Sequence, residues 1–306
     1  MAPAQFLGAT INLITFMPKP TFTKFVGGIV ALTISLAIAD PVSDRITVTV
    51  RGQGPDVLLI PGLASSSAVW DATATGLEGR CRLHIVQVAG FAGSLPRANA
   101  QGPVLQPTVD AIDAYIITNR LKMPKVIGHS LGGLMGLVLA VQHPEDVSSL
   151  LIVDSLPFFG VLFGANAAGG VAPQAAAMRD RILTETQEAY AHGETEFVRA
   201  LVKSPEGRQQ AAKWAITSDK SVVARALYED MTTDMRPKLR EIKIPVTILY
   251  AWDAAARISQ AACDGLYRQN YAPLSNKTFV RIDGSFHFIM LDRPELFATQ
   301  ADLFLK

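Results

Sequence analysis

From residue 45 to residue 155, stretches with the apolar pattern of a β-strand alternate with stretches in which apolar residues have helical spacing. This alternation predicts the fold. Arg45–Gly54 alternates apolar and polar residues and ends in turn residues, as a half-buried strand does. Pro55–Gly62 is a short continuous apolar run, which is typical of a strand buried on both faces. Pro107–Leu121 has apolar residues at helical spacing. The pattern further predicts strands over Arg82–Gly90, Pro124–His129 and Ser148–Ser155, and helices over Ser65–Leu77 and Leu131–His143.

The alternation stops at residue 157 and resumes after residue 240. No strand pattern occurs between these positions, whereas Ser204–Ala215 and Ser218–Met231 look like capped helices. Ile244–Trp252 and Lys277–Gly284 then predict two more strands, and Arg293–Leu305 predicts a closing helix. The sequence therefore predicts an α/β protein with a mainly parallel central sheet flanked by helices. Its core covers residues 40–156 and 241–306, and a helical insert covers residues 157–240.

The amino-terminal 39 residues have the layout of a secretory signal peptide. Phe25–Ala39 is an uncharged apolar run, preceded by Lys19 and Lys24 and ending in small residues before a polar segment. Fifteen residues are few for a membrane span, which needs about 20. We expect cleavage and a periplasmic or secreted protein; the alternative is an uncleaved anchor in the inner membrane. Met17 offers an alternative start with a more ordinary basic region.

Composition narrows the classes of function. The chain has 306 residues, of which 49% are hydrophobic, and a net charge of +1, so a substantial core is expected and nucleic acid is not an expected partner. Cys81 and Cys263 are far apart, and no CxxC or HExxH spacing occurs, so no metal or other cofactor is predicted. The two cysteines are expected to be buried free thiols or, in an oxidising compartment, a single disulfide.

The stretch KVIGHSLGGLMG, residues 125–136, places Ser130 between Gly128 and Gly132. It lies between an expected strand and an expected helix, and G-x-S-x-G in that context is a nucleophile elbow. The two glycines leave room for the sharp turn that exposes the serine hydroxyl. The amino end of the following helix brings N–H groups and a positive dipole end beside it.

A serine nucleophile needs a base, and His287 is the expected one. It follows the last predicted strand in a loop, so it lies at the same carboxyl edge of the sheet as Ser130, where such folds build their sites. The other histidines have other expected places: His84 within a strand, His129 next to the serine and directed away from it, His143 at a helix end, and His192 in the insert.

The base in turn needs a carboxylate that fixes its tautomer. Asp253 ends the strand VTILYAWD at the same edge and is the favoured candidate. Asp154, which ends the strand LLIVD, and Asp283, four residues before His287, are the alternatives. For the oxyanion, the expected donors are the backbone N–H groups of Leu131 and Leu63.

These residues together resemble the α/β-hydrolase superfamily. The resemblance covers about residues 45–306 and rests on PGLASSSAVW, GHSLGG, LYAWD and SFHFIMLDRPELF in that order. It implies a Ser130–Asp253–His287 triad and a helical cap formed by residues 157–240. The sequence is also similar to exported bacterial hydrolases of this superfamily. An apolar segment, Leu156–Gly164, begins the insert and would form either a pocket wall or a packing contact.

We therefore expect a serine hydrolase that cleaves a carboxylic ester through an acyl-enzyme. Its expected partner is a small apolar ester or acyl substrate, with contact to a membrane only through an uncleaved amino-terminal segment. The alternatives within enzymes are a thioester, a lactone, an amide or a carbon–carbon bond as the group cleaved. The alternative outside enzymes is a ligand-binding protein on a hydrolase fold.

Overall fold

The computed structural model describes residues 44–256 and 258–306. The predicted signal peptide or anchor and the alternative start at Met17 lie outside the described residues. Within them, no helix combines the length and the apolar character that a membrane span requires.

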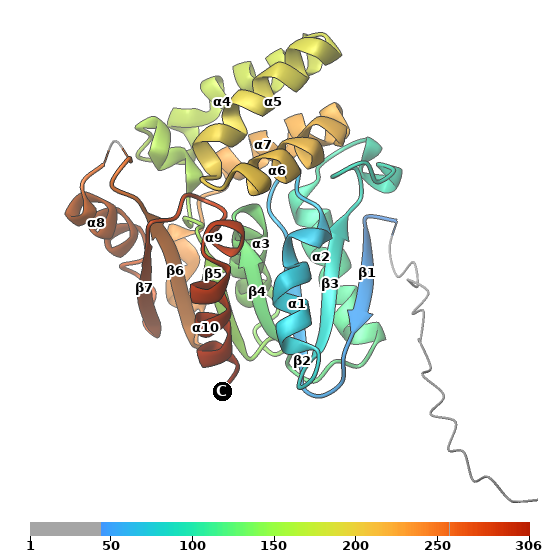
Figure 1. Ribbon diagram of the computed structural model, residues 1–306, viewed down its shortest axis with the longest axis vertical. Helices are drawn as coiled ribbons and strands as arrows, with labels where there is room; N and C mark the ends of the chain where they lie inside the picture. The colour runs from blue at the N-terminus through green and yellow to red at the C-terminus, as the bar shows by residue number, and fades with distance from the viewer. Residues whose placement is uncertain (1–43, 257) are drawn as a thin grey trace, which may run out of the picture. The chain divides into compact units, whose positions relative to one another are not determined.

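A seven-stranded sheet forms the centre of the described part of the chain (Figure 1). The strand order is β1-β3-β2-β4-β5-β6-β7; β1 is antiparallel to β3, and all other neighbours are parallel. This confirms the predicted fold class. The strands are β1 (Ile46–Arg51), β2 (Asp56–Ile60), β3 (Arg82–Val88), β4 (Lys125–His129), β5 (Ser149–Val153), β6 (Val246–Trp252) and β7 (Lys277–Asp283).

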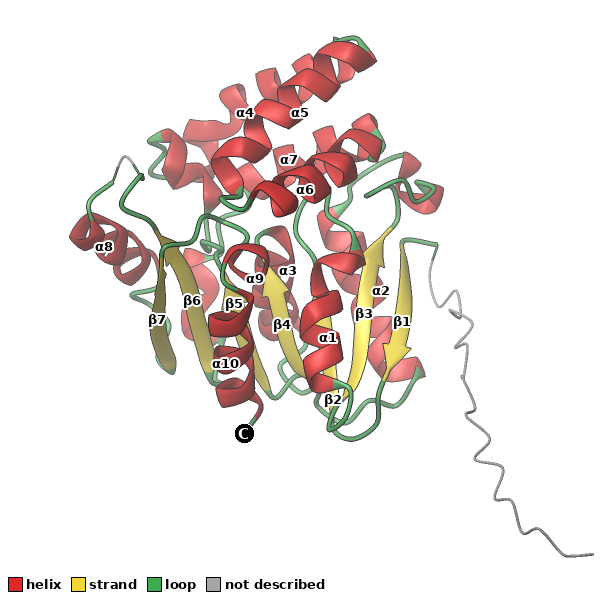
Figure 2. Cartoon of the chain, in the orientation of Figure 1, coloured by secondary structure: helices red, strands yellow, loops and turns green. Residues whose placement is uncertain are grey.

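Helices cover both faces of the sheet (Figure 2). Strand β2 shows why: Leu58 and Ile60 face one apolar cluster, while Val57 and Leu59 face another. The first cluster includes α2 (Leu105–Thr118), α3 (Leu131–Gln142) and α8 (Gln260–Asn270). The second includes α1 (Asp71–Leu77), α9 (Ile289–Asp292) and α10 (Pro294–Leu305). The prediction that the apolar run Pro55–Gly62, which contains β2, is buried on both faces is correct. A strand of this kind needs helices packed on both faces of its sheet.

Four helices lie across the end of the sheet at which the parallel strands terminate (Figure 1). They are α4 (Ala168–Thr184), α5 (Gln187–Leu201), α6 (Pro205–Thr217) and α7 (Lys220–Thr232), and no strand is found between residues 157 and 240. Short 3-10 helices precede and follow them at Phe159–Phe163 and Arg236–Glu241, and two others lie at Ser67–Trp70 and Arg97–Ala100. Phe158 is fully buried and packs with Val171, Ala175 and Met231, so the apolar start of the insert makes a packing contact.

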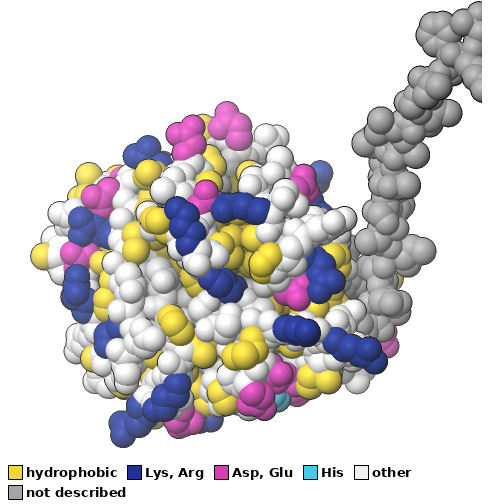
Figure 3. All heavy atoms as spheres, turned by 90° about the horizontal axis from the view of Figure 1, so that it is seen from below, with side chains coloured by type: hydrophobic (Ala, Val, Ile, Leu, Met, Phe, Trp, Pro, Cys, Tyr) yellow, Lys and Arg dark blue, Asp and Glu magenta, His cyan; other side chains and the backbone are white. Residues whose placement is uncertain are grey.

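The opposite end of the sheet mixes charges of both signs. Viewed from below, lysine and arginine side chains alternate with carboxylates and apolar patches (Figure 3). Arg82 pairs there with Asp56, at the start of β3 and β2 respectively. Cys81 and Cys263 are free and buried, and they belong to the apolar clusters on opposite faces of the sheet. The sheet itself therefore keeps the two thiols apart.

Candidate active site

Ser130 occupies a strained turn between β4 and α3. Its backbone has φ +52° and ψ −122°, a region that side-chain-bearing residues seldom adopt and that costs about 1–3 kcal/mol. A Cβ on Gly128 would lie 2.3 Å from the carbonyl oxygen of Gly132, and one on Gly132 would lie 2.3 Å from that of Ile60. No other residue type fits at either position, which is the steric requirement expected of a nucleophile elbow.

His287 lies in the loop between β7 and α9, and its neighbours bring it to the elbow. The carbonyl oxygen of His287 accepts a hydrogen bond from Nε2 of His129, the residue before Ser130, at 3.1 Å. The two imidazole rings lie 4.6 Å apart, centroid to centroid. Complete burial and the nearby His287 hold the pKa of His129 well below its usual value. His129 is therefore neutral and serves as a support for His287, while Ser130 projects from the next position.

Asp154, and not Asp253, contacts the histidine. Nδ1 of His287 lies 2.7 Å from Oδ2 of Asp154, so this nitrogen donates and Nε2 is left with its lone pair. Oδ1 of Asp154 accepts from the backbone N–H of Ala251 at 2.9 Å and from the hydroxyl of Tyr267 at 2.8 Å. Burial and the Asp154 carboxylate keep the pKa of Tyr267 well above its usual value, so its hydroxyl stays a donor.

The prediction that Asp253 holds His287 is wrong, and the lengths of the two strands explain why. Strand β5 ends at Val153, which pairs with Leu249 of β6. Strand β6 continues to Trp252, so Asp253 lies about 10 Å farther along the strand direction than Asp154. Asp154 turns at the strand end with φ +47°.

Asp253 has a different set of partners. Its carboxylate accepts from Nζ of Lys203 at 2.5 Å and from the backbone N–H of Ala255 at 2.8 Å. These hydrogen bonds lower the pKa of Asp253 below its usual value. Asp283, the third candidate, pairs with Arg281 at the surface. Asp253 therefore joins the segment between α5 and α6 to the end of β6, and Asp283 is not at the site.

The two residues expected to bind an oxyanion through their backbone N–H groups, Leu131 and Leu63, each follow a residue at the turn: Ser130 itself and Gly62. Leu131 is the first residue of α3, and the first N–H groups of a helix have no partner within it. Leu63 follows Gly62, at which a Cβ would lie 3.0 Å from Cβ of Ser130. A side chain at position 62 would therefore crowd Ser130, so the chain passes close to the serine directly before Leu63.

Asp292 is a part of the site that the sequence did not reveal. Its carboxylate accepts from the backbone N–H of Phe286 at 2.9 Å, next to His287. It also accepts from the N–H groups of Lys203 and Ser204, both at 2.9 Å, in the segment between α5 and α6. One carboxylate thus ties the histidine loop to the helical insert. An acid five residues after His287 was visible in the sequence, but its backbone partners were not.

Asp230, on α7, is a second carboxyl group within electrostatic reach of His287. Burial raises its pKa to about 7, and the positive charge of a protonated His287 opposes this rise. The group therefore titrates near neutral pH. The insert contributes a side chain whose charge changes in the same range as that of a histidine.

Comparison with known proteins identifies the family. A model of the family described as "Alpha/beta hydrolase family" matches residues 57–300. The chain belongs to this family. It is a hydrolase, as the elbow and the resemblance predicted.

Several relatives share a name. The chain is 29% identical over 217 residues to a pimeloyl-[acyl-carrier protein] methyl ester esterase of Vibrio atlanticus, covering 68% of this chain and 80% of that protein. It is also 29% identical over 219 residues to the enzyme of that name from Nitrosomonas europaea, covering 67% and 79%. Each alignment covers about two thirds of this α/β hydrolase.

Solved structures share the fold at lower identity. The enol-lactonase from Burkholderia xenovorans superposes with a TM-score of 0.71 at 17% identity, covering 88% of this chain and 99% of that one. An esterase from Exiguobacterium antarcticum gives the same TM-score and identity, covering 85% and 94%. At this identity the two structures support the architecture alone.

Proposed function

We propose that this α/β hydrolase is a serine esterase whose triad is Ser130, His287 and Asp154. The observation that carries the proposal is the 2.7 Å contact between Nδ1 of His287 and Oδ2 of Asp154, beside a strained serine. This contact fixes the tautomer in which Nε2 can accept a proton. The relatives named as methyl ester esterases support a carboxylic ester as the bond that is cleaved.

The mechanism follows from these positions. Oγ of Ser130 attacks the ester carbonyl as Nε2 of His287 takes its proton, and Asp154 stabilises the imidazolium that forms. The N–H groups of Leu63 and Leu131 bind the developing oxyanion, each contributing about 3 kcal/mol. His287 then protonates the leaving alcohol, and the acyl group remains on Ser130. Water, deprotonated by His287, attacks the acyl-enzyme and releases the acid.

The substrate class that fits is a small ester with an apolar acyl chain. Helices α4 to α7 lie over the carboxyl ends of the strands (Figure 1), which supports the proposal that residues 157–240 form a cap over the site. The relatives named above act on a methyl ester of pimeloyl-acyl-carrier protein, a substrate with a small alcohol and a longer acyl part. A simple alkyl ester of a medium-length acid is therefore the first substrate to test.

Active-site labelling tests the triad directly. The intact protein is treated with a fluorophosphonate and its mass is measured beside that of Ser130→Ala. One adduct on the wild type and none on Ser130→Ala would support the proposal. An unlabelled wild type that also fails to hydrolyse p-nitrophenyl esters would overturn it.

We also propose that the hydrolase is exported. The basic and apolar segments that end at Ala39 support this location, with the alternative of an anchor in the inner membrane. Cell fractionation with mass measurement of the mature protein tests it. A mature chain beginning at Asp40 in the periplasm or medium is expected, and a full-length cytoplasmic protein would contradict the proposal.

A further inference from the structure

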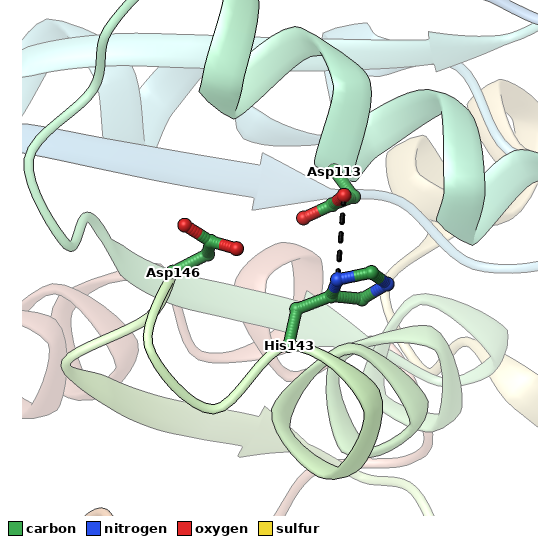
Figure 4. Close-up of side chains that lie close together, drawn as sticks. All are labelled: Asp113, His143 and Asp146. Carbon is green, nitrogen blue, oxygen red and sulfur yellow. Dashed lines mark ion pairs between the residues drawn. The ribbon is translucent and has the colours of Figure 1, made fainter.

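Three potential metal ligands meet at the end of α3 remote from Ser130. They are Asp113 on α2, His143 at the carboxyl end of α3, and Asp146 in the turn that follows (Figure 4). One nitrogen or oxygen atom from each lies within 4.8 Å of the other two. Helix α3 has 12 residues, so this cluster lies about 18 Å from the elbow along the helix axis. The catalytic residues proposed above do not include it.

The buried Asp113 carboxylate is incompletely satisfied. Its residue is 8% exposed, and its Oδ1 atom has no hydrogen-bond partner among the described residues. Figure 4 shows the two oxygens of Asp113 directed into the cluster, one toward the His143 ring and the other toward the side of Asp146. A buried polar atom without a partner costs about 1–3 kcal/mol. A cation held between the three side chains would remove that cost.

The separation between Asp113 and His143 is compatible with a metal ion bound between them. Oδ2 of Asp113 lies 3.3 Å from Nδ1 of His143. A strong charge-assisted hydrogen bond would be shorter, about 2.7–2.9 Å. Two ligands at about 2.0–2.1 Å from a tetrahedral Zn²⁺ are separated by about 3.4 Å. The observed separation is therefore compatible with two ligands of one zinc ion, as well as with the ion pair that the two side chains form without metal.

The electrostatic surroundings also favour a cation. Two carboxylates, those of Asp113 and Asp146, share the cluster with the single imidazole of His143, so negative charge exceeds positive charge there. The carboxyl end of α3 adds the negative end of a helix dipole.

We propose that Asp113, His143 and Asp146 bind a divalent transition metal, with Zn²⁺ as the ion of choice, that fastens α2 to the end of α3. One imidazole and two carboxylates suit Zn²⁺ better than Mg²⁺ or Ca²⁺, which prefer oxygen ligands alone. Water completes the coordination. The ion has a structural role, because it holds together two core helices at a distance from Ser130. The sequence spacing did not predict the site, because Asp113 is 30 residues from His143.

Calorimetric titration of the full chain with ZnCl₂, after removal of bound metal with EDTA, tests the site. We expect saturable binding of one Zn²⁺ per chain and a rise in Tm with added zinc. His143→Ala and Asp146→Asn should each weaken binding at least tenfold and abolish the rise. Glu145→Gln removes the same charge as Asp146→Asn one residue away, and His192→Ala removes an exposed histidine; both should change the affinity less than twofold.

Two results would overturn the proposal. The first is wild-type protein that shows neither saturable heat nor a Tm shift up to 1 mM Zn²⁺. The second is zinc affinity that persists in Asp146→Asn, which would place the ion at another histidine such as His287. Asp146 lies in a turn outside the apolar clusters, so its variant remains informative if His143→Ala does not fold. Because neither measurement uses catalysis, the outcome is independent of the proposed esterase activity.

Discussion

Asp154 and His287 are 133 positions apart in the chain, yet their side chains meet at 2.7 Å. The carboxylate reaches the imidazole from the end of β5, in the centre of the sheet, while His287 comes from the loop after the edge strand β7. Ala251 and Tyr267 hold the other oxygen of Asp154. The proposed base therefore pairs with a carboxylate that two further donors hold in place.

Replacement of the two rival aspartates separates their roles. Asp154→Asn should lower kcat by about 10³–10⁴-fold, because an amide in place of the carboxylate no longer stabilises the imidazolium. Asp253→Asn is the matched control and should lower kcat less than tenfold, since Asp253 contacts Lys203 instead of His287. Steady-state hydrolysis of a p-nitrophenyl ester gives both values. The reverse order of effects would restore Asp253 as the catalytic carboxylate.

The strained serine predicts a gain in stability when it is replaced by glycine. Ser130→Gly should raise the free energy of unfolding by about 1 kcal/mol relative to Ser130→Ala, because glycine adopts φ +52° without a Cβ penalty. Both variants should lack activity. Urea denaturation followed by circular dichroism measures the difference. Equal stabilities would show that the turn stores no such strain.

Asp292 is expected to act as a positioning residue for His287. Asp292→Ala leaves the N–H groups of Phe286, Lys203 and Ser204 without their acceptor, so the histidine loop and the insert lose a common anchor. We expect kcat to fall about tenfold and the free energy of unfolding to fall by about 1–3 kcal/mol.

Lys203→Met separates this effect from the nearby ion pair. It keeps the backbone N–H of residue 203 but removes the contact with Asp253, and kcat should change less than threefold. A pH–rate profile adds a second readout, since a displaced His287 should alter the acidic limb in Asp292→Ala. An unchanged profile with a lower Tm would assign Asp292 a purely structural role.

Asp230 predicts how stability depends on pH. Its folded-state pKa of about 7 exceeds the usual value of 3.8, so the folded chain binds this proton more tightly than the unfolded chain does. The free energy of unfolding should therefore fall as the pH rises from about 4 to about 7. Asp230→Asn removes this penalty, so it should have a higher Tm than wild type at pH 8 and little advantage at pH 4.

Thermal unfolding of the wild type and of Asp230→Asn between pH 4 and pH 8 measures the effect. Asp234→Asn is the comparison, because Asp234 follows the same helix but is only partly buried. A Tm difference between wild type and Asp230→Asn that does not depend on pH would contradict the assignment of the titration to Asp230.

The sequence by itself determined the sheet, the sharp turn at Ser130 and the edge of the sheet at which His287 lies. Continuous apolar runs such as that of β2 can only be buried between two layers of helices, and the glycines around Ser130 leave only one way to make the turn. His287 follows the last strand, so it had to reach the same edge. These features depend on local pattern and on the direction of the strands.

Only the tertiary structure decided which aspartate meets His287 and which acids meet His143. Asp154 and Asp253 both end parallel strands at one edge, and the sequence does not say how far β6 extends beyond β5. Asp292 accepts from the backbone N–H of Lys203, and Asp113 contacts the side chain of His143; both partners are distant along the chain. Such relationships arise from the stagger of strands and the packing of helices, and local sequence patterns do not encode either one.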